Sequence, residues 1–556
     1  MPDYSTLFSL ISLYRTRKVK CDESKPSCLR CQKLDLTCTY PGPQPKKPEF
    51  KKPIRQLLLP SVLSEPSEAL FGNQEEWKYF QLFRSEAVGE LVGFFEQPLW
   101  DRLILQACHT EVFVREAVVA ISASRIARSA KAGQMGVGMN PVVARHREAA
   151  LLHYGKAIRK IKDDLSMTSR GESEGASLRR VLIACLLVCC LEGMWGNSFN
   201  ALAHAKSGLH LLRMWVEKNP HSKKERVGTH SPSPDVVEDE IVQAFARLDI
   251  QMLTFIDVRT AEEHAVMVDE GKDTIEKMPA RFSFLEEARV YFELISRRSM
   301  HFMQVAVRAL ADGQKAGLDT ASVTAVENSP VYSWVKAGMP FGQKVSSTQA
   351  YYYQATQKKY AEELELWYQA FQPLYERIQR KKVVKVDIAA HLLFVNFVAM
   401  DIILATCLYM DNMCFDEHLE KFRAIVEVSK IIVAAKQSRR FSFSFDSGVT
   451  PWLSAVCKWC RDRTLRREAI QLLRAVASQE GVWDSLMIAE IGECMMKLEE
   501  NGVETEDIPE EARVRLKHCN MNFADRMLTV ECVRGHDEEE SIERVVEVNW
   551  PFGEWI

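Results

Sequence analysis

The chain has 556 residues, of which 47% are hydrophobic and 26% are charged, and its formal net charge is −3. Residues 1–60 hold 12 Lys and Arg against 5 Asp and Glu, a net charge of +7, which leaves −10 for the remainder. A basic end on an acidic body is typical of a protein that binds nucleic acid. The sequence contains no G-x-S-x-G, P-loop or G-x-G-x-x-G motif and no His/carboxylate cluster with metal-ligand spacing, so we predict that it is not an enzyme.

Residues 1–14 read MPDYSTLFSLISLY and do not have the features of a secretory signal. They carry Asp3 but no basic residue, and the apolar stretch Leu7–Tyr14 is short and lacks a small-residue cleavage site. Without such a signal, the cysteines outside the N-terminal region are expected to be reduced thiols.

Four cysteines lie close together in the basic segment 15–40, RTRKVKCDESKPSCLRCQKLDLTCTY. Cys21, Cys28, Cys31 and Cys38 have the spacing C-x6-C-x2-C-x6-C. Thiolates spaced in this way can bind Zn²⁺ at about 2.3 Å each, and the metal then organises a segment that is too short to form a core. We therefore predict zinc as the cofactor and these four cysteines as its ligands.

From Arg15 onward this segment resembles the binuclear zinc cluster of fungal transcription factors, C-x2-C-x6-C-x6-C-x2-C-x6-C, in which six cysteines hold two zinc ions. The family spacing puts the first two cysteines at the positions of Ile11 and Tyr14, and neither side chain can ligate zinc. Two tetrahedral zinc ions need eight bonds, which six thiolates supply only if two of them bridge. The four cysteines present do not complete that pair of sites.

Three interpretations of the missing ligands are open. The four thiolates hold a single zinc in another geometry, or the segment is metal-free, or a gene model has lost or misread a first exon that encodes the first CxxC. Residues 1–14 match nothing in the family, and the match begins abruptly at Arg15, which favours the third interpretation.

Four basic residues stand immediately before the first cysteine: Arg15, Arg17, Lys18 and Lys20. Such side chains supply salt-dependent affinity for phosphate, and Arg or Lys donors also suit the O6 and N7 atoms of guanine. The resemblance implies that Arg17 and Lys18 face a CGG-like triplet in double-stranded DNA. The alternative interpretation is a localisation signal or a solvated basic surface.

Residues 41–71 are rich in Pro and Lys and are predicted to form an extended linker. No sustained heptads follow the cysteines, so dimerisation through this region is not supported and a homodimer stays an open question. Lys46, Lys47, Lys51 and Lys52 suit nuclear import or phosphate contact as well as a plain charged linker.

Most periodic stretches after the linker predict helices. Ala150, Leu151, Tyr154, Ala157, Ile158, Ile161 and Leu165 recur on one face of a helix. Residues 181–195 are apolar nearly all round and predict a buried helix, which Gly196-Asn197 turns into an antiparallel partner at 201–215. Residues 392–408 are similarly apolar but contain Asn396 and Asp401, so we predict a core helix of a soluble protein and no membrane span.

The remaining segments predict loops and a small sheet. Residues 219–235 are polar with two Ser-Pro pairs, which predicts an exposed insertion. Ser231 and Ser233 suit phosphorylation, but a plain flexible loop is the preferred interpretation. Residues 513–523 and 527–533 predict a hairpin, with a third short strand at 543–550. Cys457 and Cys460 form a CxxC without a second pair nearby, so packing is the preferred interpretation. The acidic residues 537–540 and the aromatic residues of the tail fit either an activation segment or a solvated loop.

Residues 72–510 also resemble the "fungal-specific transcription factor domain" found in one branch of the same family. The segments that carry this resemblance are 77–111, 153–166, 182–212, 238–255 and 460–485. Each is an ordinary amphipathic helix, but their order and spread make the match specific. The resemblance implies a helical regulatory domain without assigned catalysis.

The sequence thus predicts a mostly α protein with five parts: an unmatched segment at 1–14, a partial zinc cluster at 15–40, a linker at 41–71, a helical regulatory domain at 72–510, and a hairpin and tail at 511–556. The predicted function is a nuclear, sequence-specific, DNA-binding regulator of RNA polymerase II transcription, with the transcription machinery as partner. The alternative is an interaction protein that keeps the regulatory body but has lost DNA binding. Target genes, effector ligand and the choice between activation and repression do not follow from the sequence.

Overall fold

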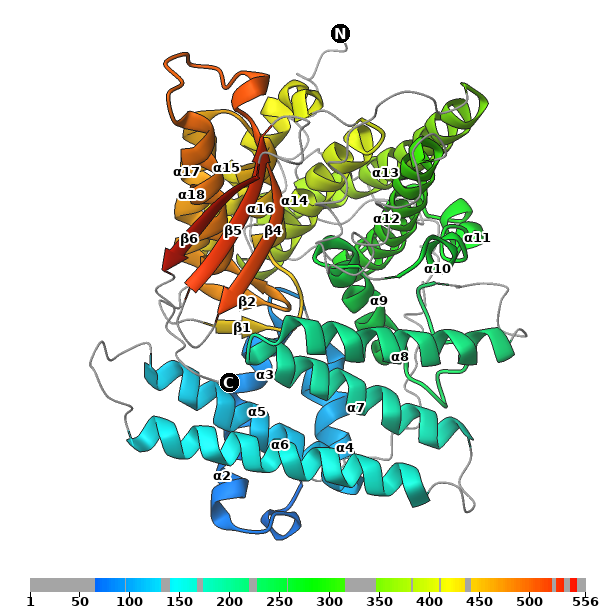
Figure 1. The fold of residues 1–556 in the computed structure, drawn as a ribbon. Helices are drawn as coiled ribbons and strands as arrows, with labels where there is room; N and C mark the ends of the chain where they lie inside the picture. The colour runs from blue at the N-terminus through cyan, green and yellow to red at the C-terminus, as the bar shows by residue number, and fades with distance from the viewer. Residues whose placement is uncertain are drawn as a thin grey trace, which may run out of the picture. The chain divides into compact units, whose positions relative to one another are not determined.

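The structure is a computed structural model, and contacts divide the chain into two units, residues 1–65 and 66–556. It describes residues 66–95, 97–131, 141–167, 174–219, 228–257, 259–315, 347–381, 384–409, 412–435, 442–522, 527–534 and 541–547, all of which belong to the second unit. Figure 1 shows the fold.

The described part of the chain is mostly helical, as predicted. Its α-helices are α2 (Gln74–Leu82), α3 (Val88–Val92), α4 (Ile104–Thr110), α5 (Val112–Lys131), α6 (Pro141–Met167), α7 (Glu174–Met194), α8 (Ser198–Lys218), α9 (Asp239–Thr254), α10 (Ala261–Ala265), α11 (Lys272–Glu276), α12 (Leu285–Lys315), α13 (Ser347–Lys381), α14 (Val384–Thr406), α15 (Leu419–Ala435), α16 (Thr450–Trp459), α17 (Arg463–Val476) and α18 (Ser485–Glu500). Single π-helical turns occur at Phe83–Ala87 and Leu99–Leu103, and 3₁₀ turns at Glu68–Leu70, Asn412–His418 and Glu510–Ala512.

Helices α7 and α8 form the predicted antiparallel pair, and they pack beside α5 and α6 (Figure 1). Every residue from 181 to 195 is buried or half-buried, and Leu187 is only 1% exposed, which confirms the predicted buried helix. The turn between the two helices needs a positive φ, which Gly196 supplies with φ 82°. Gly208 on α8 allows close packing, because a Cβ there would lie 2.2 Å from the ring of Phe245 on α9.

Helix α6 contains the predicted amphipathic segment, but its buried face is narrower than predicted. Ala150 and Ala157 are buried against the core, whereas Leu151 is 43% exposed. The prediction for Leu151 was wrong because Leu151 is adjacent to Ala150, about 100° away around the helix, and the neighbouring helices cover only the Ala150 side.

Helices α12, α13 and α14 share an aromatic core. Trp367 on α13 is fully buried, and its indole nitrogen donates to the carbonyl of Ala288 at 2.8 Å. Among the described helices, Asp387–Thr406 is the one that is long and apolar enough to cross a membrane, and 67% of that stretch is buried within the protein. The prediction of a core helix in this region is confirmed.

A three-stranded antiparallel sheet follows the last helix. Strands β4 (Val514–Asn522) and β5 (Met527–Arg534) form the predicted hairpin, with Asn520 opposite Thr529. Strand β6 (Ser541–Glu547) pairs with β5, so the predicted third strand is confirmed with an earlier start. Figure 1 shows this sheet beside α17 and α18.

A second small sheet lies inside the region predicted to be entirely helical. Strand β1 (Ser442–Ser444) pairs in parallel with β2 (Ser478–Glu480), which pairs antiparallel with β3 (Trp483–Asp484). The prediction missed these strands because two or three residues are too few to show an alternating pattern. The buried Glu480 accepts hydrogen bonds from the backbone nitrogens of Gly448 and Thr450 at 3.0 and 2.9 Å, and so satisfies the N-terminus of α16.

The predicted exposed insertion at 219–235 is partly wrong. Residues 220–227 lie outside the described residues, but Thr229 and Ser231 are 5% and 7% exposed. The backbone nitrogen of Ser231 donates to Asp239 at 2.8 Å, and its hydroxyl accepts from the backbone of Ser233 at 3.2 Å. These hydrogen bonds hold the Ser-Pro segment against α9, so Thr229 and Ser231 are buried and the prediction of an exposed loop is wrong for them. The phosphorylation alternative does not fit the buried hydroxyl of Ser231.

Candidate functional site

The sequence-predicted zinc ligands and DNA contacts all lie outside the described residues. These are Cys21, Cys28, Cys31 and Cys38 for zinc, and Arg15, Arg17, Lys18 and Lys20 for DNA. Their roles stay predictions. Within the described ranges, no group of three or more His, Cys, Asp or Glu side chains is placed to hold a metal ion.

The predicted packing role of the other cysteines is confirmed for the CxxC. Cys457 and Cys460 are 1% and 2% exposed and are not joined by a disulfide. Burial raises the pKa of Cys457 to about 12 and that of Cys460 to about 11. Because thiolates rather than thiols bind metal and react, this pair suits packing and not redox or metal chemistry at neutral pH.

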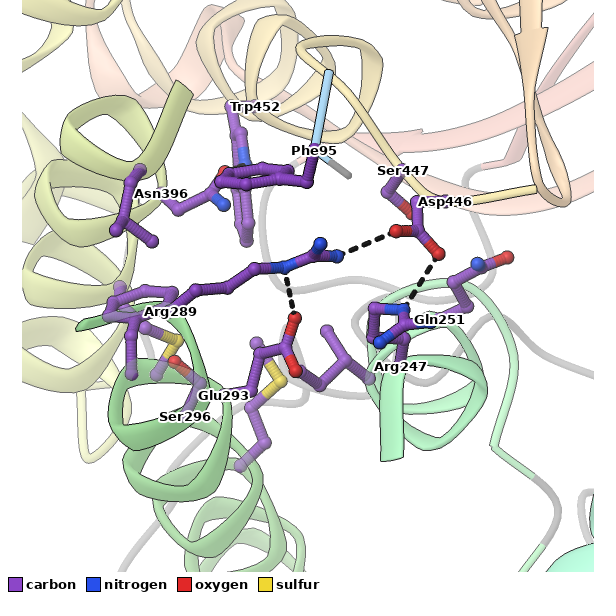
Figure 2. A pocket seen from close by; sticks show the side chains of 15 residues that line it. Phe95, Arg247, Gln251, Arg289, Glu293, Ser296, Asn396, Asp446, Ser447 and Trp452 are labelled. Atoms are coloured by element: carbon purple, nitrogen blue, oxygen red, sulfur yellow. Dashed lines mark hydrogen bonds and ion pairs between the residues drawn. The ribbon is translucent and has the colours of Figure 1, made fainter. Parts of the chain in front are cut away.

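A cavity in the described unit lies where five segments meet. They are the stretch before α4, helices α9, α12 and α14, and the segment from β1 into α16. The empty space between the lining side chains is about 610 Å³, part of it open to solvent. Figure 2 shows the lining, which includes Phe95, Arg247, Gln251, Arg289, Phe292, Glu293, Ser296, Met300, Leu393, Asn396, Met400, Asp446, Ser447 and Trp452.

One side of this cavity is a buried ion cluster centred on Asp446. Its carboxylate accepts from Arg247 at 2.9 Å and from Arg289 at 2.6 Å, and it also accepts from Gln97. Burial acts to raise the pKa of Asp446, but the two guanidinium groups outweigh it and hold the pKa below the usual value. Arg289 also pairs with Glu293 at 2.7 Å, and its guanidinium carbon lies 4.0 Å from the centre of the Phe95 ring (Figure 2).

A second buried ion cluster joins α9, α10 and α12. Asp249, which is fully buried, accepts from Arg259 at 2.5 Å and lies 3.2 Å from Arg297 and 3.1 Å from the ring of His301. His301 in turn contacts His264 at 2.9 Å between Nδ1 atoms. The arrangement joins three helices through charge and hydrogen bonds.

This second cluster predicts a dependence of stability on pH. Burial lowers the pKa of His264 to about 3, although the Asp257 carboxylate opposes the shift, and Arg259, His301 and Arg308 lower the pKa further. The unfolded chain binds a proton at this residue below about pH 6.5, whereas the folded chain does not until about pH 3. The contribution of a neutral His264 to the free energy of unfolding is therefore complete above pH 6.5. It is lost as the pH falls below 6.5, by at most about 1.4 kcal/mol per pH unit.

We expect His264→Gln to reduce the slope of unfolding free energy against pH between 6.5 and 5, as measured by urea unfolding at each pH. His210→Gln, on the exposed face of α8, is the control and should leave the slope unchanged. An equal slope for His264→Gln and the unaltered chain would contradict the assignment.

Sequence reasoning did not find either ion cluster. Asp446 lies 199 residues from Arg247 and 157 from Arg289 in the chain, so no local spacing connects them. The sequence gives only a weak sign of such clusters, namely a charged residue within an otherwise apolar stretch. Charged residues at the protein surface often show the same pattern.

Two family models match the chain. Residues 15–47 match the fungal Zn(2)-Cys(6) binuclear cluster domain, and residues 36–258 match the fungal specific transcription factor domain. Both are domains of fungal transcription factors, and together the two matches cover residues 15–258. Proteins with these domains are transcription regulators, which are generally not enzymes.

A protein from Emericella nidulans is similar to part of the chain. It is the "Aspercryptin biosynthesis cluster-specific transcription regulator atnN", which is 24% identical over 322 residues that cover 53% of this chain. The chain spans about half of that relative, 47% of its length. No solved structure matches the chain.

The zinc-cluster match begins at Arg15, the residue at which the sequence resemblance also begins. The domain type binds zinc, but Ile11 and Tyr14 lie outside the match and bring no ligand. Four thiolates complete one tetrahedral zinc site, whereas two zinc ions need six with two bridging. The donor set of this zinc-cluster chain therefore fits one zinc and does not fit a pair.

Proposed function

We propose that the chain is a nuclear, sequence-specific DNA-binding regulator of RNA polymerase II transcription that recognises CGG-like triplets. One observation carries the proposal. Residues 15–47 match a zinc-cluster domain, and residues 36–258 of the same chain match a transcription factor domain. The similarity to a transcription regulator from Emericella nidulans supports the proposal that the chain regulates transcription.

The distribution of charge supports the same function. The net charge of +7 in residues 1–60 favours the approach of a polyanion to this end of the chain, and the acidic remainder does not. In this proposal Lys18, together with Arg17, donates to guanine edges in the major groove, and Lys46 contacts phosphate without regard to sequence.

A second candidate function rests on the missing ligands. With Ile11 and Tyr14 in place of two cysteines, a chain that cannot form the paired zinc site would keep the helical body and act by binding other regulators. The two functions differ in one measurable property, namely zinc-dependent discrimination between a CGG-containing duplex and a scrambled one.

The test of base recognition uses the chain with Ile11→Cys and Tyr14→Cys, in which all six ligands are present. Lys18→Ala in that background should weaken binding to a CGG-containing duplex by roughly 1–3 kcal/mol and change binding to scrambled DNA much less, because a base contact is lost. Fluorescence anisotropy at fixed salt measures both affinities.

Lys46→Ala is the matched control, since it removes the same side chain from the linker. It should weaken binding to both duplexes slightly and to the same extent. The slope of the logarithm of affinity against the logarithm of salt concentration should also fall by about one. Equal losses on both duplexes for Lys18→Ala would show that Lys18 contacts phosphate rather than a base.

A further inference from the structure

The cavity beside the Asp446 cluster contains polar groups that have no hydrogen-bond partner among the described residues. Ser296 on α12 is 2% exposed and lines the cavity, and its hydroxyl has no hydrogen-bond partner among the described residues. The buried hydroxyl of Ser447, also in the lining, is likewise unpaired there. Buried hydroxyls without partners are uncommon in folded proteins because each costs free energy.

Asn396 on α14 adds a third unused donor. Its side-chain oxygen accepts from the indole nitrogen of Trp452 at 2.5 Å, which fixes the orientation of both side chains. This hydrogen bond leaves the amide nitrogen of Asn396 for another acceptor. Figure 2 shows Asn396 and Trp452 on one side of the cavity and Ser296 below them.

The remaining lining is largely apolar and partly aromatic. Phe95, Phe292 and Trp452 supply flat surfaces, and Met300, Leu393 and Met400 fill the space between them. Flat aromatic walls with a few fixed polar groups are typical of sites for small organic molecules.

The charges of the cavity decide what kind of molecule fits. Arg247 and Arg289 are balanced by Asp446 and Glu293, and each of these four groups takes part in an ion pair within the cluster. A ligand with its own carboxylate would bring an uncompensated charge into a buried site or displace Asp446, and both are costly. An uncharged ligand avoids this cost.

We propose that this cavity binds a small, uncharged, planar organic molecule that carries a carbonyl-type oxygen. The ring system lies against Phe95, Phe292 and Trp452, and the oxygen accepts from the hydroxyl of Ser296 or Ser447 or from the amide of Asn396. The ion cluster on Asp446 keeps Arg289 stacked on Phe95 and so shapes the wall without binding the ligand itself. This site goes beyond DNA recognition and does not depend on it.

Two probes that share one ring system test the proposal on the full chain. 2-Acetylnaphthalene is an uncharged aryl ketone, and 2-naphthoate carries a carboxylate on the same ring. Equilibrium dialysis should show saturable binding of the ketone to one site per chain, and binding of the carboxylate at least about 10-fold weaker because of its buried charge.

Variants of α12 locate the site. Ser296→Ala should weaken binding of the ketone roughly 3- to 10-fold, the scale of one neutral hydrogen bond, and Ser296→Leu should abolish it by filling the cavity. Ser299→Ala is the matched control, since Ser299 is 1% exposed, lies on the same helix and also has an unpaired hydroxyl, but does not line the cavity.

Thermal unfolding of each variant checks that the fold is kept. If Ser296→Leu does not fold, the comparison of Ser296→Ala with Ser299→Ala still tests the proposal. No saturable binding of the ketone up to its solubility limit would overturn the proposal. Tighter binding of the carboxylate, or equal losses for Ser296→Ala and Ser299→Ala, would overturn it as well.

Discussion

Leu187→Asp should abolish cooperative unfolding of the helical body. Leu187 is 1% exposed in the middle of α7, a helix that is apolar nearly all round and is packed by α8 and α5. An unpaired carboxylate buried at this position costs several kcal/mol. That cost is a large part of the typical 5–15 kcal/mol stability of a domain. Urea unfolding followed by circular dichroism measures the loss.

Leu152→Asp is the control for this substitution. Leu152 lies on α6, is 52% exposed and should tolerate the same change with a loss below about 0.5 kcal/mol. A cooperative transition of normal midpoint in Leu187→Asp would mean that α7 is not part of the core. The helical signal of the unaltered chain should also be insensitive to a chelator, since the described body has no metal-binding group.

Glu499→Gln is expected to destabilise the C-terminal part of the body by about 3–5 kcal/mol. Glu499 on α18 is fully buried, lies 3.1 Å from Arg461, pairs with Arg466, and accepts from the backbone nitrogen of Val514 at 2.8 Å. Its carboxylate therefore connects α17, α18 and β4. The substitution keeps the shape but leaves two buried guanidinium groups without their countercharge.

The adjacent Glu500→Gln provides the comparison. Glu500 pairs with Arg467, whose side chain is 46% exposed, and a pair of this kind contributes about 0–1 kcal/mol. Chemical unfolding of both variants measures the difference. Equal and small losses for Glu499→Gln and Glu500→Gln would show that the buried pair contributes no more than a surface pair.

The elements that were predictable from the sequence are those with a repeated local pattern. The continuous apolar run around Leu187 predicted a buried helix, and Gly196 predicted the turn after it, because both signals lie within a few residues of each other. The hairpin of β4 and β5 was predictable for the same reason. The exposure of Leu151 could not be predicted in this way, because the width of a buried helix face depends on which neighbouring helices cover it.

The cavity and its ion cluster were beyond prediction from the sequence because they depend on contacts between distant residues. Nothing local to Ser296 shows that Asn396 and Asp446 converge on the same space, and the serine is an ordinary residue of an amphipathic helix until α12 and α14 are packed. The zinc segment is the opposite case. Its four cysteines and Lys18 lie within 21 consecutive positions, so spacing alone indicated the chemistry.

The central claim is that Cys21, Cys28, Cys31 and Cys38 belong to a zinc cluster that lacks two of its ligands. Elemental analysis of the purified chain tests it most directly, by counting zinc per polypeptide. We expect at most one zinc per chain in the unaltered protein and two after Ile11→Cys with Tyr14→Cys. Two tightly bound zinc ions in the unaltered chain, or no gain after the two substitutions, would contradict it.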